Sequence, residues 1–228
     1  MKKKIDIRQL SLEQLTDEIV KLGEKPYRAK QVHQWLWKKR AIDFDQMTNL
    51  SKSFRKLIEN NFIINALVLS EAQISSDKTI KNAFLLADNS VIEGVLIPTK
   101  KRMTACVSVQ VGCSLDCAFC ATGKLKRVRN LNADEIYDQV VMINDQSQKE
   151  YSIPISNIVY MGMGEPLLNY KNVLLSVDRI TSEDGLGMSA KRITISTAGI
   201  YKKIISLADD KVKFNLALSL HAANDEKR

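Results

Sequence analysis

The sequence predicts an α/β fold, because three patterns along its 228 residues agree. Residues 1–65 carry apolar side chains at helical spacing, and residues 66–100 alternate as the strands of a hairpin do. From about residue 101, strand-like and helix-like segments take turns, which is the pattern of a parallel sheet with covering helices. We therefore expect a helical domain at 1–65, a connecting β-hairpin at 66–100 and a larger α/β core at 101–228.

Helix-start residues support the helical prediction for the first domain. Ser11 is followed three residues later by Gln14, a capping box in which each side chain satisfies a free backbone N–H group of the other residue. Pro26 suits the first turn of a second helix, and Ser51 or Ser53 opens a third. We expect helices that begin near these residues.

The core is predicted to alternate strands with helices. The strand candidates are residues 105–111, 156–161, 191–197 and 213–220, and the helix candidates are residues 132–147, 170–182 and 200–208. Parallel strands end at one edge of their sheet, and ligands of such folds bind at that edge. The residues that follow each strand are therefore the candidate site residues.

All four cysteines, Cys106, Cys113, Cys117 and Cys120, lie within 15 residues. A disulfide framework spreads its cysteines along the chain, whereas so tight a group indicates a metal or redox site. The last three follow the first strand with C-x3-C-x2-C spacing, so they can bind three irons of a cubane cluster and leave the fourth iron open for a cofactor. Structural zinc is the alternative, but it needs four ligands and no histidine is near. The spacing favours the cluster.

Polar residues also follow the other three strands. Gly162–Pro166 comes after the second strand, where glycines allow close approach of a ligand and Glu165 can accept hydrogen bonds from a cationic group. Ser196 and Thr197 end the third strand, and Ser219–His221 ends the fourth. An ordinary glycine-rich turn and a structural histidine are the alternatives, but the convergence of four strand ends favours a site.

Net charge is +8, and residues 1–65 hold 14 Lys and Arg against 8 Asp and Glu. Such an excess at one end indicates a polyanionic partner such as nucleic acid, and a solvated helical surface is an equally good explanation. No apolar run approaches the about 18 residues that a membrane span needs. The basic N-terminus is not followed by an apolar segment, so no secretory leader is predicted and we expect a cytoplasmic protein without membrane contact.

Together these segments resemble the radical S-adenosylmethionine (radical SAM) superfamily and, within it, the RNA adenine-C2 methyltransferases of the RlmN type. The matching strings are Ala105–Cys113, Cys117–Gly123, Met161–Leu167, Ile195–Gly199 and Ser219–His221. The resemblance covers essentially the whole chain. It implies a [4Fe–4S] cluster on Cys113, Cys117 and Cys120. It also implies contacts with S-adenosylmethionine (SAM) from Gly164, Glu165, Ser196, Ser219, Leu220 and His221.

The resemblance further implies methylation of C2 of an adenine in 23S ribosomal RNA and in certain transfer RNAs, by way of a methylated cysteine. It implies a monomer that takes electrons from a flavodoxin- or ferredoxin-type donor. Glu93 matches the family's general base, and Cys106 matches the cysteine that releases the RNA by forming a disulfide bond. Because Glu93 shares a strand face with Val91 and Val95, we expect an apolar setting that suits a base. A solvated carboxylate and a small buried hydrophobic cysteine are the respective alternatives.

The chain departs from the family in one respect. The family's methyl-carrying cysteine lies far downstream and matches none of the four cysteines, and four of the six βα units expected of a partial barrel are present. We therefore expect a C-terminally truncated chain that cannot complete methyl transfer alone.

Three other functions stay open. One is methylation of adenine C8 in ribosomal RNA, which confers antibiotic resistance and which Pro166 disfavours. Another is radical chemistry on peptides or small molecules, which the basic clusters at 100–102 and 124–129 disfavour. The third is a non-catalytic, zinc-bound RNA-binding module.

Overall fold

The computed structural model describes residues 4–100, 102–222 and 224. The chain divides into two compact units. The first unit comprises Met1–Ala66 together with Arg179–Gly187, and the second comprises Leu67–Asp178 with Met188–Arg228. The first unit therefore includes a segment from far downstream in the sequence.

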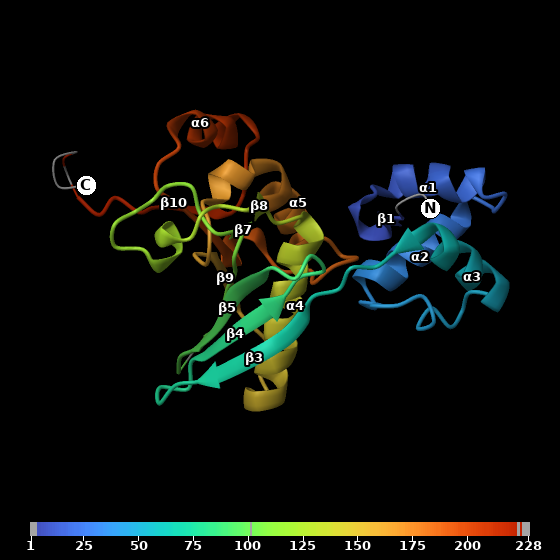
Figure 1. Cartoon of the computed structure of the whole chain (residues 1–228), viewed down its shortest axis with the longest axis horizontal. Helices are drawn as coiled ribbons and strands as arrows, with labels where there is room; N and C mark the ends of the chain where they lie inside the picture. Colours follow the sequence, from blue (N-terminus) through green and yellow to red (C-terminus); the bar gives the residue numbers. More distant parts are fainter. Residues whose placement is uncertain (1–3, 101, 223, 225–228) are drawn as a thin grey trace. The chain divides into compact units, whose positions relative to one another are not determined.

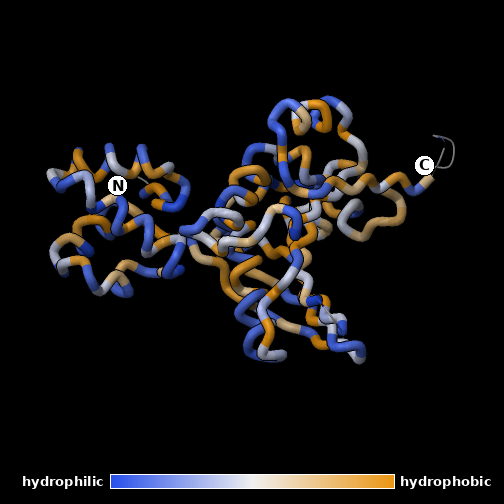
Figure 2. Tube along the Cα trace, turned by 180° about the vertical axis from the view of Figure 1, so that it is seen from behind, coloured by the Kyte–Doolittle hydropathy of each residue, from blue (hydrophilic) through white to orange (hydrophobic). Residues whose placement is uncertain are grey.

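The first unit contains the helices α1 (Leu12–Lys21), α2 (Tyr27–Trp37) and α3 (Lys52–Asn61) (Figure 1). Ser11 caps α1 through the predicted capping box, and the Ser51 hydroxyl accepts a hydrogen bond from the first turn of α3. Hydrophobic and hydrophilic residues alternate along these helices, as Figure 2 shows. The helices are amphipathic, and the predicted start residues are confirmed.

The downstream segment of the first unit is fixed to helix α2 by Arg179. The Arg179 guanidinium lies 3.0 Å from Nε2 of the buried His33, and its carbon lies 4.6 Å from the ring centre of Trp37. Burial and the nearby Arg179 charge both lower the pKa of His33. A neutral imidazole beside a stacked guanidinium is therefore part of the core of this unit.

The second unit is organised around a mixed sheet in the order β11-β10-β9-β6-β5-β4-β3. Its strands are β3 (Val68–Ile74), β4 (Ile80–Leu85), β5 (Val91–Pro98), β6 (Met103–Cys106), β9 (Asn157–Tyr160), β10 (Ile193–Thr197) and β11 (Asn215–Leu218). Neighbouring strands from β6 to β11 pair in parallel, and β3 to β6 pair antiparallel. The predicted α/β class is confirmed, and the hairpin strands are continuous with the parallel sheet.

Helices α4 (Ala133–Tyr151), α5 (Tyr170–Thr181) and α6 (Tyr201–Asp209) alternate with the parallel strands, close to their predicted positions. Helix α4 runs beside β3, β4 and β5 (Figure 1) and packs so closely that a Cβ atom on Gly94 would lie 3.1 Å from Ile143. Among the described residues, no helix is both long and apolar enough to cross a membrane.

The predicted strand at 105–111 is interrupted. Strand β6 ends at Cys106, and the chain then forms β7 (Gln110–Val111), which pairs with β8 (Arg129–Asn130) in a separate two-stranded ladder. The break occurs at Ser108, whose backbone bonds to the Gln139 side chain of α4 instead of to a neighbouring strand. The Ser108 N–H donates to Oε1 of Gln139 at 2.8 Å, and Nε2 of Gln139 donates to the Ser108 carbonyl at 3.1 Å. The apolar run in the sequence does not reveal that a side chain 31 residues away forms these hydrogen bonds.

The remaining elements are short. They are β1 (Ile5–Asp6), β2 (Phe62–Ile63) and the 3-10 helices Ile7–Gln9, Ala121–Lys124, Pro166–Asn169 and Ala190–Arg192.

Candidate active site

A pocket of about 280 Å³ lies in the second unit, at the carboxyl ends of its parallel strands. Its wall combines the cysteine loop with the loops that follow β9, β10 and β11. Predicted site residues that line it are Cys113, Cys117, Cys120, Gly164, Glu165, Ser196, Ser219 and His221. The structure therefore gathers, around one cavity, residues that span more than a hundred positions of the sequence.

The cysteine loop is closed at its base by the β7–β8 ladder. Cys113 N–H donates to the carbonyl of Leu125 at 3.2 Å, and Val128 N–H donates to the carbonyl of Val111 at 2.8 Å. Gly112 adopts φ +71°, and a Cβ atom there would collide with the backbone carbonyl of Lys126. The loop can close in this way only with glycine at that position.

The cysteines fit the donor set of an iron–sulfur cluster. Cys113, Cys117 and Cys120 are half-buried, form no disulfide bond and line the same pocket. No three His, Cys, Asp or Glu side chains of the described residues gather closely enough to hold a single metal ion. A cubane cluster instead spreads its thiolates over separate irons, whereas zinc needs four ligands around one ion. Cys106, the fourth cysteine, is buried in β6 and does not line this pocket, so it does not complete a four-cysteine zinc site here.

Glu165 joins two of the strand-end loops. Its side chain is buried, and Oε1 accepts a hydrogen bond from Leu167 N–H at 2.9 Å. Oε2 accepts another from Ala198 N–H at 2.8 Å. Both oxygens therefore have a backbone partner, which fixes the carboxylate at the pocket wall.

The ends of β10 and β11 also line the pocket. The hydroxyls of Ser196 and Ser219 lie 2.9 Å apart, and the ring of His221 packs against Phe119 of the cysteine loop at 4.1 Å between ring centres. Leu220 is half-exposed and does not line the pocket. The structure thus brings together the predicted hydroxyls and the imidazole but not Leu220.

Glu93 and Cys106 lie outside the pocket but on one face of the sheet. Val95 pairs with Cys106, which pairs with Val159, and paired residues point to the same face. Glu93, two residues before Val95, shares this face, which is opposite to that of Gly94, where α4 packs. The two residues therefore face the same side of the sheet.

The expected apolar setting of Glu93 is wrong. Its side chain is 47% exposed and forms an ion pair with Lys81 on β4 at 2.6 Å. Val91 on the same face is exposed too, because helix α4 covers the other face of these strands. Cys106, in contrast, is buried, and burial raises the pKa of its thiol to about 11.

The sequence analysis missed the buried polar residues behind the pocket. The Ser108 hydroxyl donates to the carbonyl of Glu93 at 2.5 Å and accepts from Met163 N–H at 2.8 Å. A Cβ atom on Gly162 would lie 2.7 Å from that hydroxyl oxygen. Ser108 therefore connects β5 to the glycine-rich loop, and the only trace of it in the sequence is a serine within an apolar strand.

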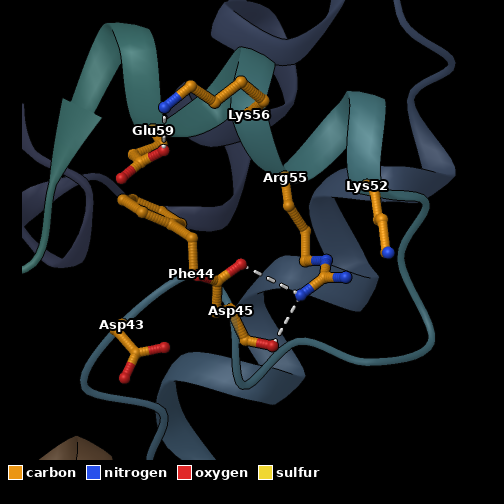
Figure 3. A pocket seen from close by; sticks show the side chains of 7 residues that line it. All are labelled: Asp43, Phe44, Asp45, Lys52, Arg55, Lys56 and Glu59. Atoms are coloured by element: carbon orange, nitrogen blue, oxygen red, sulfur yellow. Dashed lines mark hydrogen bonds and ion pairs between the residues drawn. The ribbon is translucent and has the colours of Figure 1, made fainter.

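A second pocket, of about 360 Å³, lies in the first unit (Figure 3). Arg55 donates to the Asp45 carbonyl at 2.6 Å and to its carboxylate at 3.2 Å, and Lys56 pairs with Glu59 at 2.9 Å. Basic and acidic side chains line this pocket in equal number, so its composition does not single out a ligand of either sign.

Parallel strands, a cysteine loop and a strand-end pocket together fit a protein that binds an iron–sulfur cluster, and the chain belongs to the radical SAM superfamily. The model of that superfamily matches residues 107–228. Residues 5–64 match a second model, described as a ribosomal RNA large subunit methyltransferase N-terminal domain. Membership implies a [4Fe–4S] cluster and SAM as cofactors.

Individual relatives confirm the resemblance to the RlmN type. A "Probable dual-specificity RNA methyltransferase RlmN" from Cytophaga hutchinsonii is 60% identical over 99% of this chain. One from Fervidobacterium nodosum, with the same name, is 48% identical over 98% of the chain. The crystal structure of a radical SAM methyltransferase from Sphaerobacter thermophilus aligns with a TM-score of 0.86 at 38% identity, over 97% of this chain and 65% of that one. The chain spans 62% of the length of the Cytophaga relative.

Proposed function

We propose that this protein methylates C2 of an adenine in 23S ribosomal RNA and in transfer RNAs. The proposal rests on one observation above all: three thiols line the same pocket as Glu165, Ser196, Ser219 and His221. The match of residues 5–64 to a ribosomal RNA methyltransferase domain and the names of the relatives support RNA as the substrate.

In this proposal the pocket holds both cofactors. Cys113, Cys117 and Cys120 would hold the cluster, and the loops after β9, β10 and β11 line the same pocket. When bound, the cluster supplies the electron that starts radical chemistry on SAM. The backbone around Gly164 and Glu165, the hydroxyls of Ser196 and Ser219, and His221 would orient SAM in this pocket. Leu220 does not line the pocket, and only the family resemblance assigns it to SAM.

The substrate reacts on the sheet face that carries Glu93 and Cys106. Glu93 is exposed there, so a large substrate can reach its carboxylate, which takes up the C2 proton. As a thiolate, Cys106 would attack the sulfur of the family's methyl-carrying cysteine, which none of the four cysteines here matches; the S–S bond would form as the bond from that sulfur to the RNA-bound carbon breaks, and that carbon would then take up a proton. The Cys106 pKa of about 11 keeps the thiol protonated at neutral pH until a base removes the proton. In the structure no disulfide bond joins any two of the four cysteines.

RNA binding is proposed for the basic domain at residues 1–65. Its 14 Lys and Arg against 8 Asp and Glu would neutralise phosphates, so RNA affinity falls steeply as salt rises. The enzyme would act in the cytoplasm as a monomer and receive electrons from a flavodoxin- or ferredoxin-type protein.

A chimaera tests the proposal. Residues 1–228 replace the matching part of the Cytophaga relative, and the anaerobically reconstituted protein is incubated with SAM, reductant and 23S ribosomal RNA fragments or transfer RNA. Mass spectrometry is expected to detect 2-methyladenosine, and a Cys117→Ala chimaera is expected to give none. 8-Methyladenosine instead would favour the resistance-type reaction, and no methylation by a chimaera that carries its cluster would contradict the proposal.

A further inference from the structure

Gln110 in β7 is fully buried, and both ends of its amide are bonded. Its Oε1 accepts a hydrogen bond from the backbone N–H of Glu165 at 2.9 Å. Its Nε2 donates to Oδ1 of Asn130, on the paired strand β8, at 2.8 Å. One side chain therefore connects the glycine-rich loop to the ladder that closes the cysteine loop.

The glycine-rich loop also rests on Gln110 sterically. Gly164 adopts φ +97°, and a Cβ atom there would lie 2.5 to 2.8 Å from side-chain atoms of Gln110. The Gln110 side chain thus occupies the space that a Cβ atom on residue 164 would need. The position of the loop depends on the length and the polarity of residue 110.

Asn130 extends this connection in two directions. Its Oδ1 accepts a second hydrogen bond from Nη2 of Arg127 in the cysteine loop at 3.1 Å, and its Nδ2 donates to the carbonyl of Leu168 at 3.2 Å. Two amide side chains therefore link the end of the cysteine loop with both ends of the 165–168 segment. The Gln110–Glu165 bond of this network is buried, so breaking it leaves a polar group unsatisfied, whereas the bonds from Asn130 to Arg127 and Leu168 are exposed.

We propose that Gln110 is a positioning residue that holds the Gly164–Glu165 loop in place relative to the cysteine loop, so that the SAM site is formed before SAM binds. The inference rests on the proposed function, since it assigns SAM to that loop. Its physical basis is preorganisation: a loop already fixed in its bound conformation loses less conformational entropy when its ligand arrives. Gln110 acts through Glu165 and Asn130 and does not line the pocket itself.

The test replaces Gln110 by methionine, which keeps the length of the side chain and removes its amide. Gln146→Met is the matched control, because Gln146 of α4 forms a comparable amide pair with Asn82, through two hydrogen bonds of 2.9 Å, away from the pocket. SAM affinity is measured by anaerobic calorimetry on the cluster-reconstituted 228-residue chain. Amide hydrogen exchange of residues 162–168 is followed without SAM.

We expect Gln110→Met to weaken SAM binding by about tenfold or more, which corresponds to the loss of one buried hydrogen bond. It should also accelerate exchange in residues 162–168. Gln146→Met should leave both quantities within about twofold of the parent. Asn130→Ala is a second test variant. Because Asn130 is half-buried, its truncation leaves no fully buried cavity, and this variant tests the inference if Gln110→Met does not fold.

Parent-like SAM binding and exchange in Gln110→Met and Asn130→Ala would overturn the inference, and so would an equal loss in Gln146→Met. Absence of SAM binding by the reconstituted parent chain would instead count against the proposed function. The two failures are therefore distinguishable.

Discussion

The carboxylate of Glu165 accepts the backbone N–H of Ala198 at 2.8 Å and thereby joins the loop after β9 to the end of β10. The same side chain accepts Leu167 N–H at 2.9 Å. A buried carboxylate with two backbone donors holds two strand ends together before any ligand is present.

Glu165→Gln is expected to destabilise the second unit by about 1 to 3 kcal/mol. An amide of the same shape presents an N–H group to one of the two backbone donors, which leaves a buried donor unpaired. Urea unfolding measures the loss, and Glu71→Gln on the exposed strand β3 is the control, expected within about 0.5 kcal/mol of the parent. Equal unfolding midpoints for parent and Glu165→Gln would contradict the role of this carboxylate.

Gly112→Ala is expected to cost more than Gly23→Ala, although both glycines have positive φ. Gly23, at φ +84°, has no atom within 4 Å of an added Cβ, so only the backbone cost of about 1 kcal/mol applies. At Gly112 the Cβ would also collide with the Lys126 carbonyl, which adds roughly 2 kcal/mol.

Denaturant unfolding and the iron content after reconstitution check this pair. A lower iron content is expected only for Gly112→Ala, because only that change distorts the base of the cysteine loop. Equal losses of stability in both variants would show that backbone conformation alone matters at Gly112.

Arg129→Ala is expected to destabilise the protein by about 2 to 4 kcal/mol, because the buried Glu135 carboxylate loses two hydrogen bonds of 2.8 Å. Arg129 also bonds Asp88 at 2.6 Å and lowers the pKa of that carboxyl to about 2. A lowered pKa contributes stability above the ordinary value of 3.8 that is lost as the pH falls toward 2.

Carbon-detected NMR titration measures the Asp88 pKa directly. In Arg129→Ala the midpoint should return toward 3.8, and in Arg129→Lys it should lie between the two values. An Asp88 midpoint that stays at about 2 without Arg129 would show that the hydrogen bond from Ser90 N–H, at 3.0 Å, is sufficient.

The Cys106 thiol should react slowly with iodoacetamide at neutral pH, and its rate should rise until about pH 11. Its raised pKa also means that folding favours the protonated thiol, so this part of the stability is present below pH 9 and is lost between pH 9 and 11. Cys106→Ala should lack that part of the alkaline loss. Mass-spectrometric mapping of the alkylated residue and urea unfolding across that range measure both effects, and a rate that levels off at about pH 9 would contradict the burial argument.

Local patterns predicted the helices well and the buried network poorly. Ser11 and Gln14 lie within one turn of each other, so their capping box follows from sequence spacing alone. The cysteine loop and the strand ends were predictable for a related reason, because parallel strands must end at one edge. The partners of Gln110 and Ser108 lie 15 to 55 residues away, and no periodicity in the sequence records such distances.

The setting of Glu93 could not be predicted because alternation identifies two faces of a strand without saying which one is covered. Val91, Glu93 and Val95 look like an inward apolar face, but Gly94 marks the covered side, since only a residue without Cβ leaves room for Phe84 and α4. Small residues on the opposite face were the missing clue.

The polypeptide crosses between the two units three times, after Ala66, after Asp178 and after Gly187. A module attached at one terminus is released by a single cut, but here a protease that cleaves after Ala66 leaves the amino-terminal fragment bound to its 179–187 partner segment through the His33–Arg179 contact. Deleting residues 1–66 would leave the segment Arg179–Gly187 without the part of the chain on which it packs. The first unit is built from two separate stretches of the chain, Met1–Ala66 and Arg179–Gly187. Exchanging this unit between homologues therefore requires grafting both stretches together.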